Sequence, residues 1–366
     1  MIDDIVSVTR PRQLRRIVAL GGGTGLPAVI SGLRRHLPSQ CRITAIVTAA
    51  DDGGSSGILR QQYGVLPLGD IRNCLIALAR VAPEVTAALQ CRLSVSSGPA
   101  HALGNLLLTA LDMVAADEIA AIRLAASLLG IEDVILPSTT TRVNLVADFA
   151  DGRRVHGESA IPRYGARVLR LALDPPDASP APGVLAALDA ADAVILGPGS
   201  FYTSVLATLV VPGIAEAVVA SDAMKIFVCN LMTEPGETDG FDVAAHLDAL
   251  RAHGLSPEAL DYVVLNDAPI PQRTRARYAA EGAEPVAIDG ARAFGAGPGD
   301  GIEHAVRPLA VTADLLERGP VVRHDHDKIG RFLCTLAASR ELEPDDAFPM
   351  LADADSSRGV RHHRLD

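Results

Sequence analysis

The chain alternates short apolar runs with glycine- or acid-rich loops, and each loop is followed by a helical pattern of apolar positions. The apolar runs are rich in β-branched residues and cover positions 15–20, 43–48, 192–197, 225–231, 261–267 and 319–325. Nearly continuous apolar strands are typical of a parallel sheet that helices cover on both faces. Right-handed crossovers then predict a doubly wound, mostly parallel Rossmann-like α/β fold, with ligands at the carboxyl ends of the strands.

Residues 134–173 depart from this alternation. The stretch 143–158 alternates in polarity around Asp151 and Gly152, which predicts a type I′ hairpin. We therefore expect a small antiparallel β insertion at about 134–173 within a single α/β domain over residues 1–340. Apolar content falls beyond that point, which predicts a flexible C-terminal tail over 341–366.

The composition of the chain argues against a nucleic-acid partner and against a membrane span. The 366 residues carry a formal net charge of −11, with 3% aromatic residues and no Trp, so a nucleic-acid partner is not expected. No apolar run reaches about 18 residues, so no membrane span is expected. The five cysteines are scattered without a CxxC pair, which indicates reduced thiols and a cytoplasmic protein.

The first chemical motif is the glycine-rich stretch at 21–28. Gly23, Gly25 and Ala28 match the G-x-G-x-x-G/A pattern of dinucleotide-binding loops. Such a loop lets the backbone approach a phosphate, and the N–H groups that open the next helix face its charge. A tight strand-to-helix turn explains the same glycines without a ligand. No Lys follows them as in a Walker P-loop, so an ATPase is not indicated.

Two adjacent carboxylates, Asp51 and Asp52, follow the second apolar run and precede "GGSSG". An acid at this place meets ribose hydroxyls in Rossmann enzymes. The second glycine-serine loop supplies further donors for a phosphate or a sugar. Adjacent carboxylates also suit Mg²⁺. An Asx turn or N-cap is the structural alternative for at least one of them.

Two further loops of the first half carry polar candidates. Asp70 is expected to cap a helix that starts at Ile71, and Arg72 to reach an anion or pair with a surface acid. His101 is more simply structural than catalytic. Asn105 is the better candidate for a base or ribose contact.

The second half repeats the strand, glycine loop and helix order at 197–204, where Ser200 or Thr203 is expected to cap the helix. Acidic residues at 234–239 would bind sugar hydroxyls or a metal, or form a solvated turn. A metal cluster at 324–326 is disfavoured, because sequential neighbours point in different directions. Arg323 and Lys328 are better candidates, as phosphate clamps.

Nine ordered motifs make the chain similar to the YvcK-like gluconeogenesis factor family, within the wider CofD-like group that includes 2-phospho-L-lactate transferase. They include "IVALGGGTGLPAVISGL", "ITAIVTAADDGGSSG", "GDIRNCLIAL", "HALGNLLLTAL", "VILGPGSFYTSVL" and "CNLMTEPGETDGFDV". The resemblance implies a cytoplasmic bacterial protein that binds UDP-sugars such as UDP-N-acetylglucosamine. It also implies a link between gluconeogenic carbon metabolism, cell-wall synthesis and cell shape. The CofD branch transfers a phospholactyl group from a nucleotide-diphosphate carrier with Mg²⁺.

The motifs and the resemblance together define the predicted site. Asp51 and Asp52 are the candidate catalytic and Mg²⁺-binding residues. The predicted ligand-binding residues are Gly21, Gly22, Gly23, Thr24, Gly25, Gly53, Gly54, Ser55, Ser56, Asp70, Arg72, Asn73, His101, Gly104, Asn105, Gly197, Pro198, Gly199, Ser200, Asn230, Thr233 and Arg323.

Three functions compete at this stage. The first is a UDP-sugar-binding regulator without a tightly bound cofactor, and the second is a CofD-like, Mg²⁺-dependent transferase. An NAD(P) oxidoreductase is third, because the extra glycine-serine loop and the absence of an evident proton relay disfavour it. We also expect a homodimer, with the insertion as its candidate surface, and a regulatory protein partner from metabolism or cell-wall synthesis.

Overall fold

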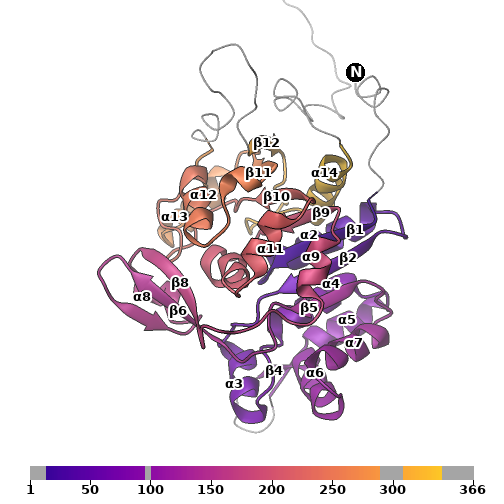
Figure 1. The fold of residues 1–366 in the computed structure, drawn as a ribbon. Helices are drawn as coiled ribbons and strands as arrows, with labels where there is room; N and C mark the ends of the chain where they lie inside the picture. Colours follow the sequence, from indigo (N-terminus) through magenta and orange to yellow (C-terminus); the bar gives the residue numbers. More distant parts are fainter. Residues whose placement is uncertain (1–13, 95–99, 289–307, 340–366) are drawn as a thin grey trace, which may run out of the picture.

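The computed structural model describes residues 14–94, 100–288 and 308–339 (Figure 1). Its centre is a seven-stranded parallel sheet in the order β12-β11-β10-β9-β1-β2-β5. The predicted α/β fold is confirmed. Its strands are β1 (Arg16–Gly21), β2 (Arg42–Val47), β5 (Val134–Pro137), β9 (Ala193–Leu196), β10 (Met224–Val228), β11 (Tyr262–Asn266) and β12 (Leu309–Ala313).

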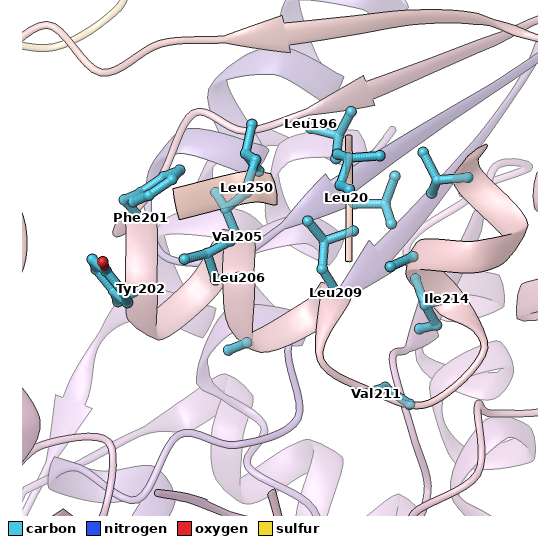
Figure 2. Packing of buried hydrophobic residues seen from close by; sticks show 14 of the residues in the cluster. Leu20, Leu196, Phe201, Tyr202, Val205, Leu206, Leu209, Val211, Ile214 and Leu250 are labelled. Atoms are coloured by element: carbon cyan, nitrogen blue, oxygen red, sulfur yellow. The ribbon is translucent and has the colours of Figure 1, made fainter. Parts of the chain in front are cut away.

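Helices cover both faces of this sheet, because successive side chains of a strand point to opposite faces. In β1, Ile17 and Ala19 pack into one core, and Val18 and Leu20 pack into the other. The first core is covered by α2 (Gly25–His36), α4 (Gly69–Leu78) and α14 (His326–Ala338). The second is covered by α9 (Val184–Asp189), the π-helix η1 (Phe201–Leu206), α11 (Ile214–Ala220) and α12 (Val243–Ala252). Figure 2 shows η1 and α11 packed on Leu20 and Leu196.

The strand order places a topological switch point in the middle of the sheet. From β1 the chain moves outward through β2 to β5, and it then returns to β9 on the other side of β1. The loops after β1 and β9 therefore leave the sheet in different directions and open a crevice between them. Both predicted glycine loops lie at this crevice.

Shorter elements surround the sheet. The remaining helices are α3 (Gly54–Tyr63), α5 (Pro83–Gln90), α6 (Leu103–Val114), α7 (Glu118–Leu128), α8 (Ile161–Tyr164), α10 (Ala207–Leu209), η2 (Pro257–Ala259) and α13 (Gln272–Ala280). A two-stranded ladder joins β3 (Arg92–Leu93) to β4 (His101–Ala102).

The antiparallel insertion is present but starts later than the predicted position 134. It is a three-stranded sheet of β6 (Asn144–Phe149), β7 (Arg154–His156) and β8 (Val168–Asp174), in the order β7-β6-β8. The prediction assigned 134–137 to the insertion, but these residues form β5, because they pair in parallel with β2. Buried side chains of β6 and β8 belong to the same core as η1 and α12.

The hairpin between β6 and β7 forms where it was predicted, with a different turn. Asp148 pairs with Arg154, and the Phe149 N–H donates to the Arg153 carbonyl, so three residues form the connection. Gly152 has a φ of 82° and closes it. A three-residue connection with a left-handed glycine replaces the predicted two-residue type I′ turn.

One predicted strand is wrong. Residues 319–325 form a loop with an isolated bridge at His324, and the last strand is β12. Pro320 has no N–H to donate to a ladder, and Val321 is 48% exposed. The segment that pairs with β11 is Leu309–Ala313, which the apolar pattern did not single out.

No single helix in the described parts of the chain is long and apolar enough to cross a membrane. The bent pair Phe201–Leu209 and Ile214–Ala220 passes this test by length and composition only. The η1 part of this pair is wholly buried in the core. The predicted flexible tail at 341–366 lies outside the described residues.

Candidate functional site

Two glycine-rich loops meet backbone to backbone at the switch point. A Cβ atom on Gly25 would lie 2.2 Å from the carbonyl oxygen of Pro198, and one on Gly199 would lie 3.0 Å from the Gly22 oxygen. Gly23 has a φ of 60°, which favours glycine. The structure thus brings together the predicted loop residues Gly21, Gly22, Gly23, Thr24, Gly25, Gly197, Pro198, Gly199 and Ser200.

Helix α2 begins at Gly25 with its first turn unneutralised. Thr24 makes no side-chain cap, and the first turn holds no acidic residue. The first N–H groups of a helix lack intrahelical partners and form the positive end of its dipole. This end of α2 therefore favours an anion.

The matching helix start on the other loop is already occupied by two carboxylates, those of the half-buried Glu234 and the buried Glu237. Glu234 accepts the Phe201 N–H at 2.8 Å. Glu237 accepts the N–H groups of Tyr202 at 2.9 Å and Thr203 at 3.2 Å. These carboxylates satisfy the start of η1, so of the two helix starts at this crevice only that of α2 lacks a side-chain cap.

The prediction that Ser200 or Thr203 caps the second helix is therefore wrong. Ser200 makes no capping bond, and the Thr203 hydroxyl donates to Glu237 at 2.9 Å. Burial is the main cause that raises the pKa of Glu234 to about 8, and the neighbouring Glu237 raises it further. Burial also raises the pKa of Glu237. Glu234 and Glu237 of the acidic loop therefore cap η1, whereas Asp239 is exposed.

A cavity of about 380 Å³ opens at the start of α2. One wall is apolar, with Leu231, Met232 and Ala283 packed against Tyr278 and Val322. The opposite wall is polar. Its lining contains the predicted residues Thr24, Gly25, Pro198, Gly199, Ser200, Asn230, Thr233 and Arg323, and also Glu234, Glu281, His324 and His326.

The segment before α14 closes this cavity. The exposed Arg323 side chain pairs with Glu317. His324 is buried, and burial lowers its pKa to about 4, so it is neutral at pH 7. The His326 ring lies 3.0 Å from the Ser31 hydroxyl of α2. The wall therefore combines one exposed cation with two imidazoles.

A glycine contact between α2 and α14 sets the position of this wall. A Cβ on Gly32 would lie 2.0 Å from the His326 carbonyl oxygen, and one on Gly330 would lie 2.1 Å from the Gly32 carbonyl carbon. The two helix backbones thus touch at this crossing. Contact at this distance holds the start of α14 beside the start of α2.

The adjacent carboxylates Asp51 and Asp52 lie after β2, and each accepts a backbone N–H. Asp51 accepts the Gly53 N–H at 2.8 Å, as an Asx turn does. Asp52 accepts the Ser159 N–H of the insertion at 2.9 Å. The second Asp therefore ties the loop after β2 to the antiparallel sheet.

Asp70 does not cap its helix as predicted. Helix α4 starts at Gly69, and the Asp70 carboxylate instead accepts the Gly23 N–H at 2.7 Å. A Cβ on Gly22 would lie 2.5 Å from the same carboxylate. Burial raises the pKa of Asp70 to about 6. The glycine loop thus has the cavity on one side and Asp70 on the other.

A carboxylate that was not predicted as a site residue joins this group. Glu158 has a pKa raised to about 8, first by burial and then by the charges of Asp51 and Asp52. Burial likewise raises the pKa of Asp51. Carboxyl groups are therefore concentrated behind the glycine loop, and Glu158 is mostly protonated at pH 7.

A chain of hydrogen bonds connects the other predicted residues of the first half. Arg72 donates to Asn73 at 2.8 Å and to Asn105 at 2.9 Å. The Asn105 amide donates to Ser55 at 3.2 Å, and Ser55 lies 2.8 Å from a His101 ring nitrogen. Asn105 is 1% exposed and lies outside the cavity lining, so its expected contact with a base is not supported by its position.

The remaining predicted residues pack around these groups. The Ser56 hydroxyl accepts the Gly69 N–H at 3.1 Å. A Cβ on Gly104 would lie 2.8 Å from the Arg72 side chain. Gly53 and Gly54 begin α3, and Asn230 donates to the Gly199 carbonyl at 3.0 Å. The predicted residues thus form two groups, one around the cavity and one around the carboxylates, and the loop at 21–25 separates them.

The sequence model of the family "2-phospho-L-lactate transferase CofD" matches residues 17–298 of this chain. The chain belongs to the CofD family. Within it, the chain is 39% identical to the gluconeogenesis factor of Bacillus subtilis (strain 168), over 88% of this chain and 98% of that protein. It is 38% identical to a putative gluconeogenesis factor of Nostoc sp., over 91% of this chain and 71% of that protein.

A solved structure supports the same assignment. The crystal structure of a member of the UPF0052 family from Bacillus halodurans superposes with a TM-score of 0.79 and 36% identity. The match covers 88% of this chain and 99% of the other. The predicted resemblance to the gluconeogenesis factors within the CofD family is confirmed.

Several residues of this CofD-family site were missed from the sequence. Glu158 stands between Gly157 and Ser159 in a motif that served only to recognise the family. Tyr278 lies on α13, with no glycine loop or charge run to mark it. His324 and His326 were weighed only as metal ligands, whereas Asp325 between them caps α14. Tyr278 and the two histidines share one signal, their position after β11 and β12, which only the strand pairing reveals.

The carboxylate oxygens of Asp51 and Asp52 supply only part of the coordination that Mg²⁺ needs. Over residues 14–94, 100–288 and 308–339, no three His, Cys, Asp or Glu side chains form a metal-binding group. Asp51 and Asp52 would each offer the oxygen that is not held by a backbone N–H. Mg²⁺ commonly takes one or two carboxylates and fills its coordination with water and phosphate oxygens. The residues therefore fit Mg²⁺ only together with a phosphorylated ligand.

Proposed function

We propose that this chain is a sugar-nucleotide-binding regulator, with a UDP-sugar such as UDP-N-acetylglucosamine as its ligand. The observation that carries the proposal is the unneutralised start of α2 at the mouth of a cavity with one apolar and one polar wall. A nucleotide-sugar has an apolar base face, two phosphate charges and a polar sugar. The names of its relatives support a role in gluconeogenic carbon metabolism.

The ligand is placed by matching its parts to the walls. The diphosphate lies at the N–H groups of Thr24 and Gly25, and Arg323 leaves Glu317 to pair with it. The base lies against Tyr278. The sugar extends over the glycine loop toward the carboxylates. In the cell, ligand occupancy reports the supply of cell-wall precursors to a protein partner, and so affects cell shape.

A thermal titration tests the binding. UDP-N-acetylglucosamine at a hundred times its dissociation constant would stabilise the chain by about 2.7 kcal/mol and raise Tm by about 3.5 °C. Arg323→Ala should weaken binding about tenfold, because a charge-assisted hydrogen bond is lost. Arg331→Ala is the matched control, because its side chain is 64% exposed against 62% for Arg323 and also pairs with one acid. No shift at millimolar ligand would refute the proposal, and so would equal losses in the two variants.

The pH dependence of binding gives a second test. Glu234 lines the cavity, and its pKa of about 8 means that it gains charge between pH 7 and 9. A UDP-sugar has no terminal phosphate, so the charge of its diphosphate stays constant there. If the bound ligand raises the Glu234 pKa by about one unit, affinity falls about fivefold between pH 7 and 9. Glu234→Gln should flatten the profile, and an equally steep decline in that variant would contradict this reasoning.

The same ionisation affects the free protein, so the pH series requires calorimetric titration rather than Tm. The folded pKa of Glu234 is raised above its ordinary value of 4.5. The corresponding stability is complete below about pH 4.5 and is lost as pH rises through about 8. A change of Tm with pH therefore mixes folding with binding.

A second function is favoured by the carboxylates behind the glycine loop. A CofD-type transferase would use Asp51 and Asp52 to hold Mg²⁺, which would neutralise and polarise the transferred phosphorus group. Asp70 would orient the loop through Gly23. Incubation with a deazaflavin alcohol and a nucleotide-diphosphate donor, followed by mass spectrometry, distinguishes the functions. Product formation supports the transferase, and binding without product supports the regulator.

A further inference from the structure

A second hollow, of about 310 Å³, lies beside the ligand cavity and shares one wall residue with it, Val322. The start of α13 and the loop before α14 form its two sides. Its floor is mainly apolar, and Val321 at its edge is 48% exposed. The apolar lining consists of Ala268, Pro269, Pro271, Leu316, Val321 and Val322.

The rim of this hollow carries positive charge that is not neutralised. The two acids in its lining are engaged, because Asp314 pairs with Lys328 at 2.7 Å and Glu317 pairs with Arg323. Within the described parts of the chain, four arginines around it have no carboxylate partner. They are Arg273, Arg275, Arg277 and Arg318.

Helix α13 presents three of these arginines to solvent. It has no buried residue and no acid in its first turn. Arg277 donates to the carbonyl of Pro320, which lies between the lining residues Gly319 and Val321. Arg273 and Arg275 flank Thr274, which lines the hollow. In a chain with a net charge of −11, such a cationic rim around an apolar floor fits an acidic segment that carries an apolar side chain.

The same chain contains a segment of this chemistry. Residues 341–355 read "ELEPDDAFPMLADAD", with acids at 341, 343, 345, 346, 353 and 355 and no basic residue. Phe348 stands between the two acidic groups, and Met350 and Leu351 follow it. We propose that residues 341–355 bind in this hollow of their own chain, with Phe348 on the apolar floor and the acids at the arginine rim.

The chain is long enough for this contact. Lys328, near the start of α14, lines the hollow, and the helix ends at Ala338. The helix from Lys328 to Ala338 measures about 15 Å at 1.5 Å per residue. The ten residues from Ala338 to Phe348 span up to about 33 Å when extended. The segment can therefore return along α14 to the hollow, next to Arg323 of the ligand cavity.

The absence of Trp from the chain permits a direct test in the full-length protein. Phe348→Trp introduces a single tryptophan at the proposed anchor, which is excited at wavelengths that the five tyrosines do not absorb. Its emission should shift to the blue, and acrylamide should quench it several-fold less than a free peptide of residues 340–366 with the same substitution. Salt of about 0.5 M, where the Debye length is roughly 4 Å, should reverse most of this protection.

Charge reversals supply the control. Arg273→Glu with Arg275→Glu should remove the protection, and adding Asp345→Lys with Asp346→Lys should restore part of it. Arg123→Glu with Arg153→Glu makes the same charge change at exposed arginines elsewhere and should have no effect. Quenching equal to that of the free peptide would overturn the proposal, and so would protection that depends on protein concentration. None of these measurements needs a nucleotide, so the proposed function can fail independently.

Discussion

Gly25→Ala is expected to lower the free energy of unfolding by about 3 kcal/mol, the upper range for an overpacked site. The added Cβ would lie 2.2 Å from the Pro198 carbonyl oxygen and 2.7 Å from the Gly199 nitrogen. Both neighbours are backbone atoms, so no flexible side chain can move aside. Gly25 does not have a positive φ, so alanine can adopt its backbone conformation. Inside a helix, alanine stabilises the fold by up to about 1 kcal/mol relative to glycine. The steric cost exceeds that gain.

The same change should also abolish protection by UDP-N-acetylglucosamine, because the start of α2 must move away from the second glycine loop. Chemical denaturation measures the first effect and thermal titration the second. Gly319→Ala is the control, because its Cβ would meet no atom within 4 Å and its φ is not positive. It should be neutral or stabilise by about 0.5 kcal/mol. If the two variants had equal stability, the backbone contact would not be a constraint on the fold.

The glycine loop was predictable from the sequence because its signals are local. A buried strand, a run of glycines and an amphipathic helix follow one another between Arg16 and His36. The second loop at 197–200 repeats this order. Parallel strands bring the two loops to one edge of the sheet, so the crevice followed from the strand assignment. The sequence could not show that Gly25 touches Pro198, since this contact joins the two halves of the chain.

The division of the site into two groups was not predictable. Asp70 was expected to cap its own helix, a local role, yet it holds Gly23, which lies 47 positions earlier. Asn105 was expected at the ligand, yet it is buried against Arg72, 33 positions earlier. Side-chain hydrogen bonds over such separations depend on how α4 and α6 pack on the sheet. Residue type and spacing do not contain that information.

The position of the last strand could not be predicted from the sequence either. Residues 319–325 contain two adjacent valines and looked like a strand, whereas Leu309–Ala313 pairs with β11. Both segments are short and apolar. Pairing with a neighbour decided between them, and it placed Arg323 in the wall of the cavity instead of at the end of a strand.

Glu237→Ala is expected to destabilise the fold by about 3 kcal/mol, because it removes the acceptor of three buried donors. Glu237 is 6% exposed and accepts the N–H groups of Tyr202 and Thr203 and the Thr203 hydroxyl. Each unsatisfied buried donor costs about 1–3 kcal/mol. Removing a carboxylate whose pKa is raised by burial offsets part of this cost. The lost acceptor outweighs that relief, because the donors lie at a helix start, where no intrahelical partner exists.

Glu237→Gln separates hydrogen bonding from charge. The amide oxygen can still accept the two N–H groups, so this variant should lose less than about 1 kcal/mol. Glu216→Ala is the matched control, because Glu216 accepts the Gly213 N–H at the start of α11 but is exposed to water. It should cost about 0.5 kcal/mol. If Glu237→Ala were as mild as Glu216→Ala, water would replace the carboxylate, and the start of η1 would be open to a ligand phosphate after all.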